Sequence, residues 1–205
     1  MEELKVRTTD YLASVGIEVP SHLPTIEEMD EVTPRSAQDL AGRLSALAYV
    51  IGLGFGANGS DLSEQLQKYD LVPFVSEREK SLLSEEVIDD QDKVDMSWQT
   101  ECAQALAWCI GLVELDHFQH CDDDLAQKIP FKTDPSDFIR SAKLRPIAEI
   151  QEQSDILYRM QWYAKNCRLT GRDCDLSESI ISERRKAIDW VYGVEEDWDE
   201  VPMDT

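Results

Sequence analysis

The stretch at residues 97–115, SWQTECAQALAWCIGLVEL, limits the possible folds more than any other part of the chain. At about 100° per residue, its apolar side chains fill one broad helical sector and leave a narrow polar strip. The apolar positions are Trp98, Cys102, Ala105, Leu106, Cys109, Ile110, Leu112 and Val113. A helix this apolar, yet interrupted and flanked by charges, is typical of a central core helix and not of a membrane span. We therefore expect the rest of the chain to pack around it.

One carboxylate breaks this apolar sector. Glu101 projects between Trp108 and Leu112, and a buried carboxylate must either find a cation and hydrogen bonds or take up a proton. Near the end of the chain, Arg184 is centred on an apolar helical stripe and lacks a partner of its own. We expect Glu101 to pair with Arg184, with Arg159 as the substitute. We interpret the pair as a core interaction that sets the register of two helices, in preference to a polar binding pocket.

Helical spacing of apolar residues recurs along the whole chain, and no run of alternating apolar residues is long enough to propose a sheet. We predict an all-α fold: a single-domain helical bundle of about seven to nine helices, with a central buried helix at 97–115 packed on the two C-terminal helices. The helical domain is expected to span residues 1–193. Residues 194–205 are expected to form a mobile acidic tail.

A glycine-rich segment, Gly54-Phe-Gly56-Ala-Asn-Gly59, satisfies the pattern GxGxxG literally. The dinucleotide-binding version needs a strand before it, a helix opening inside it and an acidic residue after the next strand. Here the preceding residues have helical spacing and follow a helix start signal. We interpret the glycines as a flexible loop that ends a helix, and expect no cofactor.

The net charge restricts the possible partners. The chain has 20 Lys and Arg against 42 Asp and Glu, a formal net charge of −22. Such a surface repels nucleic acids and anionic membranes, and it favours encounter with basic proteins. Trp198 is either a contact anchor for a partner or an edge packed back on the domain. The expected partner-binding residues are Glu195, Glu196, Asp197, Trp198, Asp199 and Glu200.

Ligand-type side chains cluster in one place, where His117, His120 and Cys121 follow the central helix. No HExxH or paired CxxC pattern accompanies them, so a solvated loop is the simpler interpretation and a metal site the alternative. The five cysteines are odd in number, and no signal peptide precedes the first residues. We therefore expect a reducing, cytoplasmic location.

Several segments, in this order, resemble the bacterial family called domain of unknown function 4272. They are the TTDYLASVGIEVPSHLP segment, the RSAQDLAGRLSALAYV helix, the Trp98-x-x-Glu101 helix with ALAWCIGL, Arg159-x-x-Trp162, and Glu183-Arg184 with Ala187, Ile188 and Trp190. The likeness covers residues 5–193. It implies a mainly helical, cytoplasmic bacterial domain and brings no catalytic residues with it. The acidic tail and the 117–124 cluster depart from the pattern.

These features favour a non-catalytic acidic binding protein, such as an immunity protein that masks a basic toxin. Two alternatives stay open. One is an enzyme with a polar pocket around Glu101, Arg159 and Arg184, although no nucleophile is placed beside that carboxylate. The other is a protein that binds metal weakly through the histidines and the cysteine named above.

Overall fold

A computed structural model describes residues 1–203 of the 205-residue chain. This part of the chain forms nine α-helices, two short 3-10 helices and no strand, which confirms the predicted all-α fold. The α-helices are α1 (Glu2–Ser14), α2 (Ala37–Gly54), α3 (Gly59–Lys68), α4 (Glu77–Ser84), α5 (Asp90–Cys109), α6 (Leu125–Lys128), α7 (Ser136–Ser141), α8 (Ile147–Thr170) and α9 (Glu178–Tyr192). The 3-10 helices are η1 (Val72–Phe74) and η2 (Trp198–Glu200). Within residues 1–203, no helix combines the length and apolar character needed to cross a bilayer.

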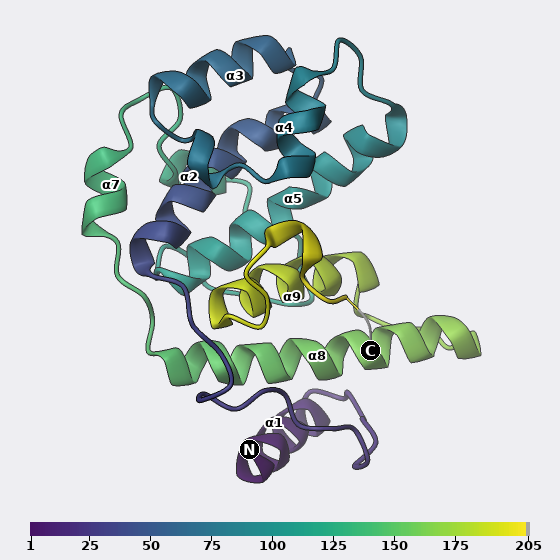
Figure 1. The fold of residues 1–205 in the computed structure, drawn as a ribbon. Coiled ribbons are helices and arrows are strands. Elements are labelled where there is room, and N and C mark those ends of the chain that lie inside the picture. Colours follow the sequence, from purple (N-terminus) through teal and green to yellow (C-terminus); the bar gives the residue numbers. More distant parts are fainter. Residues whose placement is uncertain (204–205) are drawn as a thin grey trace.

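The helices are arranged around α5, which packs against α2 on one side and α9 on the other. In turn α9 packs on the long helix α8, and α1 lies on the far side of α8 (Figure 1). The short helices α3 and α4 pack on each other and on α2. The central helix was predicted to pack on both C-terminal helices. It packs on α9, whereas α8 packs on the other side of α9.

The central helix begins and ends earlier than the predicted range 97–115. It begins at Asp90 because the Asp89 side chain caps it, accepting the Asp92 backbone N–H at 2.8 Å. It ends at Cys109 because Gly111 adopts a positive φ of 74°, which a side chain disfavours. The last residues of the predicted helix therefore form the beginning of a loop.

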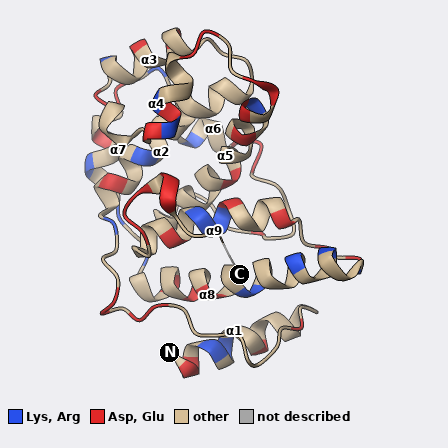
Figure 2. Ribbon diagram, turned by 45° about the vertical axis from the view of Figure 1, so that its right-hand side comes forward, with Lys and Arg blue, Asp and Glu red and all other residues tan. Residues whose placement is uncertain are grey.

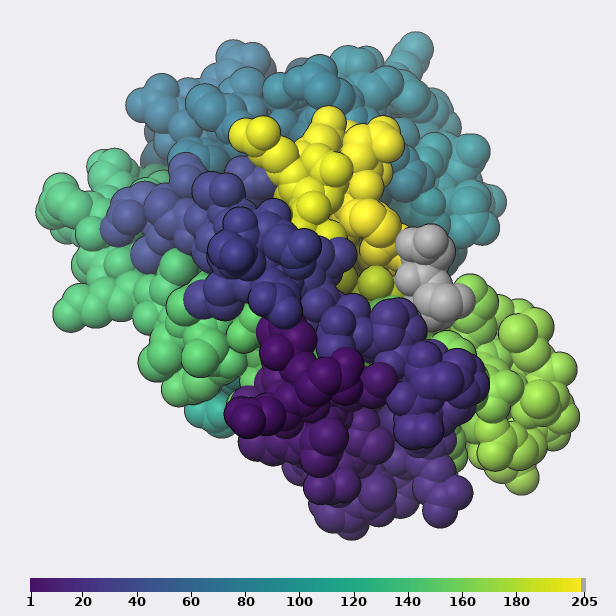
Figure 3. All heavy atoms as spheres, turned by 60° about the horizontal axis from the view of Figure 1, so that its bottom comes forward, coloured from purple at the N-terminus to yellow at the C-terminus, as the bar shows by residue number. Residues whose placement is uncertain are grey.

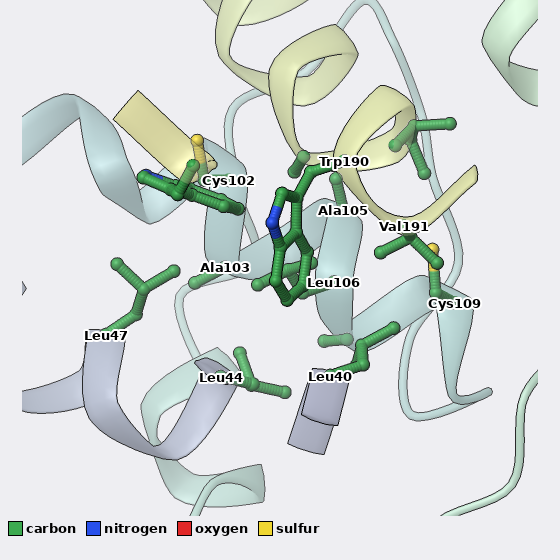
Figure 4. Packing of buried hydrophobic residues seen from close by; sticks show 14 of the residues in the cluster. Leu40, Leu44, Leu47, Cys102, Ala103, Ala105, Leu106, Cys109, Trp190 and Val191 are labelled. Atoms are coloured by element: carbon green, nitrogen blue, oxygen red, sulfur yellow. The ribbon is translucent and has the colours of Figure 1, made fainter. Parts of the chain in front are cut away.

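The core is assembled mainly from three helices (Figure 4). Leucines 40, 44 and 47 of α2 face Ala103 and Leu106 of α5, and Trp190 and Val191 of α9 close the cluster from the other side. The small side chains of α5 allow the three helices to approach closely.

The glycines of the GxGxxG segment have structural roles. A Cβ on Gly54 would lie 2.4 Å from the Ser97 backbone nitrogen and 2.8 Å from the Lys93 carbonyl oxygen, so only glycine fits where α2 crosses α5. Gly56 has a φ of 80°, in the loop that follows α2. A helix, and not a strand, precedes the segment, and this supports the interpretation as a helix-ending loop.

The C-terminal segment, residues 194–203, lies against the helical domain. Trp198 is only 5% exposed, and its ring meets the edge of Trp190 at a centroid distance of 5.4 Å. The Arg43 guanidinium lies 4.1 Å from the Trp198 ring centre. In Figure 3 this segment, drawn in yellow, covers the surface between the blue and teal parts of the chain. Of the two alternatives for Trp198, the structure therefore shows the second: the side chain is packed back on the domain. The end of the predicted tail, residues 204–205, lies outside the described residues.

We expect Gly54→Ala to lower the free energy of unfolding by about 1–3 kcal/mol, because the methyl group would push α2 away from the α5 backbone. Gly52→Ala is the control, since its Cβ would make ordinary contacts at 3.4 Å, and helix propensity favours alanine by about 1 kcal/mol. Urea unfolding of both variants measures the difference. Equal stabilities would contradict the close approach.

Candidate functional site

The predicted pairing of Glu101 with Arg184 is present at the contact between α5 and α9. One oxygen of Glu101, Oε2, lies 2.8 Å from Nη2 of Arg184 and 3.0 Å from Nε. Both side chains are 1% exposed. Charge-assisted hydrogen bonds of this kind offset the cost of removing two charges from water.

The remaining donors of Arg184 hold the loop that follows α5. Its Nη1 donates to the Asp116 carbonyl at 2.6 Å, and its Nη2 donates to the Gln119 carbonyl at 2.9 Å. The side chain therefore connects α9 to a loop that has no regular hydrogen-bonding pattern of its own. Arg184 is therefore one of the side chains that hold this loop.

Two side chains of α5 hold the next part of the same loop. The second Glu101 oxygen, Oε1, accepts the Cys121 backbone N–H at 3.0 Å. One helical turn further along, the Gln104 side-chain oxygen accepts the Asp122 N–H at 3.2 Å. The Glu101–Arg184 ion pair therefore holds residues 116–122 in place, and it also links α5 to α9.

Arg159, the alternative partner considered for Glu101, does not contact it. It forms a two-pronged ion pair with Asp155, one turn earlier on α8, with both distances at 2.8 Å. The Thr8 hydroxyl of α1 donates to the same carboxylate, so this second buried pair fastens α1 to α8. The three residues of the enzyme alternative therefore do not form one pocket.

The side chains named for the metal-site alternative have different surroundings. His117 is buried, and its Nε2 lies 2.6 Å from the Gln153 amide nitrogen of α8. His120 is exposed, with Nδ1 3.5 Å from Glu101 Oε1. Among residues 1–203, no group of three or more His, Cys, Asp or Glu side chains is arranged to hold a metal ion.

Burial has a clear effect on His117. Removal from water, with the nearby Arg184 charge as the second cause, lowers the pKa of His117 from 6.5 to about 4. The short contact with Gln153 suits a neutral ring whose Nε2 accepts the amide hydrogen. His117 is therefore a neutral core residue at physiological pH.

The anchored loop forms one wall of a cavity of about 400 Å³, which we call the α2–α5 cavity. Its apolar lining includes Ile51, Phe55, Ala103, Leu125, Ile129 and Phe131. Its polar lining is Thr100, Cys121, Asp122 and Asp123. No pattern in the sequence predicts this cavity. The only sequence signal is a pair of phenylalanines, at positions 55 and 131, placed beside glycine and proline outside any apolar stripe.

A second hollow, of about 600 Å³, lies beside the C-terminal segment, and Arg35, Arg43, Trp190 and Trp198 are among its lining residues. Its arginines already have partners. Arg43 pairs with Glu79 at 2.6 Å, and both side chains are buried. Arg35 donates to the carbonyls of Glu195 and Glu196 at 3.0 and 2.7 Å. These contacts hold the C-terminal segment in place, so the hollow belongs to the structural framework.

The model of the family described as "Domain of unknown function (DUF4272)" matches residues 4–201. The chain belongs to this family. The match runs past residue 193 and includes the buried Trp198 and Val201, so the DUF4272 domain takes in most of the segment that the sequence analysis set apart as a tail. No curated protein and no solved structure matches the chain.

We expect Arg184→Met to destabilise this DUF4272 domain by about 3–5 kcal/mol, because it leaves the Glu101 charge buried without a cation. The double variant Glu101→Leu/Arg184→Met should recover most of the loss in urea unfolding. The double variant removes Glu101, the acceptor of the Cys121 amide, and the single variant removes the arginine that holds Glu101 in place. Hydrogen exchange at the Cys121 amide should therefore accelerate in both variants. Unchanged exchange would show that the pair does not hold the loop.

We expect His117 to make the folded state less stable as the pH falls. The unfolded chain takes up a proton near pH 6.5, whereas the folded state resists protonation until about pH 4. Stability is therefore fully present above pH 6.5 and is lost between pH 6.5 and 4. Between pH 7 and 5 this loss is about 2 kcal/mol.

The measurement is urea unfolding of the wild type and His117→Gln at pH 7 and pH 5. Asp189, whose pKa burial raises to about 6, works in the opposite direction in this range and is common to both proteins. The variant should therefore lose less stability on acidification than the wild type does. Parallel curves would mean that His117 is solvated or already protonated.

Proposed function

We propose that this protein is a non-catalytic binding protein of the bacterial cytoplasm that holds a basic protein partner on its acidic surface, as an immunity protein masks a toxin. The net charge of −22 gives long-range attraction to a basic partner and repulsion of nucleic acid. The family match assigns no activity that would compete with this interpretation.

The observation that carries the proposal is the way Arg78 joins two acidic segments that are distant in sequence. Its backbone N–H donates to Asp199 at 2.9 Å, while its guanidinium contacts Asp92 at 3.0 Å and Asp95 at 2.6 Å. The C-terminal segment and the beginning of α5 therefore both contact Arg78. Figure 2 shows acidic residues along both segments. Arg78 therefore brings carboxylates of both segments to one part of the surface.

Several carboxylates on this surface are free to meet a partner. Glu196 and Glu200 of the C-terminal segment are exposed, as is Glu86 in the loop before α5, and no cation of the described residues forms an ion pair with any of them. Glu195 instead accepts the backbone N–H groups of Glu196 and Asp197 at 2.6 and 3.0 Å. Trp198 contributes by fixing the segment from below, because its ring is buried.

The alternative of an enzyme has less support. Glu101 and Arg184 are both 1% exposed, and their hydrogen bonds go to each other and to the loop after α5. A carboxylate engaged in this way has no free access to a substrate proton. A site built on these two residues would first require the loop to open.

We expect Glu86→Lys/Glu196→Lys/Glu200→Lys to weaken co-purification with the basic product of a gene next to this one by about tenfold or more, because it reverses charge at the contact. Glu3→Lys/Asp10→Lys/Asp173→Lys is the matched control, with the same charge change at exposed sites elsewhere. Binding by the wild type should also weaken when salt rises from about 0.05 M to 0.5 M. No co-purification, or equal loss in both variants, would contradict the proposal.

A further inference from the structure

We propose that the α2–α5 cavity receives an apolar side chain from a basic, amphipathic segment of the partner protein, with the segment's Lys or Arg residues meeting the aspartates at the cavity rim. This inference rests on the proposed function, and it adds a second element to it: the place where the partner is anchored. Nothing in the net charge alone selects this place.

The cavity has the size and lining of a docking site for one large side chain. At about 400 Å³ it lies at the lower end of the range of about 300–1,000 Å³ that is typical of ligand pockets. Its floor is apolar, built from α2, α5 and α6. A leucine or aromatic side chain placed there would lose its contact with water, and buried anchors of this kind supply most of the binding energy at protein interfaces.

The apolar surface extends past the cavity mouth. Phe55 is 73% exposed and Phe131 is 43% exposed, although both line the cavity. Large apolar side chains gathered at one exposed place are unusual in a monomeric protein and mark interaction sites. A partner segment lying across the mouth would cover both rings.

The charge at the rim identifies the partner as basic. Asp122 and Asp123 line the cavity, and Asp124 follows directly. Lys128 lies 3.9 Å from Asp122 and 3.0 Å from Asp124, whereas Asp123 has no cationic partner in residues 1–203. An arginine or lysine beside the docked apolar residue would therefore find an unpaired carboxylate.

Buried side chains also hold the rim in position. The backbone N–H of Cys121 donates to Glu101, and that of Asp122 donates to Gln104. Because these anchors are buried, the aspartates are held in place and the partner does not have to order the loop on binding. A second copy of this chain is the less suitable occupant, since it would bring its own 22 excess negative charges to an acidic rim.

The probe is a synthetic helical peptide with leucines on one face and lysines on the other, and its control is the same peptide with serine in place of leucine. Fluorescence anisotropy gives the affinities. The second readout is alkylation of Cys121 in the Cys174→Ser protein, because the other three cysteines are buried. A peptide seated in the cavity would cover the Cys121 thiol.

We expect the leucine peptide to bind and to slow Cys121 alkylation by about fivefold or more. Ala126→Trp, which fills the mouth from an exposed position, and Asp123→Lys should each weaken its binding by about tenfold, equal to about 1.4 kcal/mol. Ala148→Trp and Asp173→Lys are matched exposed controls outside the cavity and should leave binding unchanged.

Equal binding of both peptides, with Cys121 unprotected, would overturn the cavity proposal and leave the acidic binding function standing. If neither peptide binds at low salt, the proposed function fails with it. Protection of Cys121 by a small apolar dye but not by the leucine peptide would overturn the proposal in favour of a small-ligand pocket. Self-association that Ala126→Trp abolishes would overturn it in favour of a second copy.

Discussion

The ion pair between Glu101 and Arg184 is the interaction on which the surface of this protein depends. Taking both charges out of water is costly, and buried pairs of this kind contribute little net stability by themselves. Here both oxygens of the carboxylate and most guanidinium donors are used, and three of the hydrogen bonds go to backbone groups of one loop. The pair therefore links two helices and also holds the loop after α5 in place. That loop forms one wall of the α2–α5 cavity.

Three further arginines are buried with carboxylates, and this affects how the protein presents its charge. These pairs are Arg43 with Glu79, Arg159 with Asp155, and Arg185 with Asp189. Each pair is neutral overall and lies inside the molecule. The formal net charge of −22 is therefore carried by the surface, where cations are fewer than the composition alone suggests. This distribution supports the proposed attraction to a basic partner.

The sequence predicted the all-α architecture and the Glu101–Arg184 pair, because a single carboxylate in an apolar sector and a single arginine in an apolar stripe each need a partner. It misplaced the central helix because the cap at Asp89 and the positive φ of Gly111 depend on local geometry that periodicity does not contain. The cavity could not be predicted, since its walls come from α2, α5 and a loop whose position is set by Arg184. Trp198 was left with two alternatives for a similar reason: Arg43 lies more than a hundred residues away from it.

The contacts of Trp198 have a consequence for how the chain is made. Its indole ring covers Arg43 of α2 and the edge of Trp190 of α9, so the core between these helices is sealed by one of the last described residues. During translation, the helices emerge before the residue that closes them. The packing around Arg43 and Trp190 can therefore be completed only after position 198 has been synthesised and has left the ribosome.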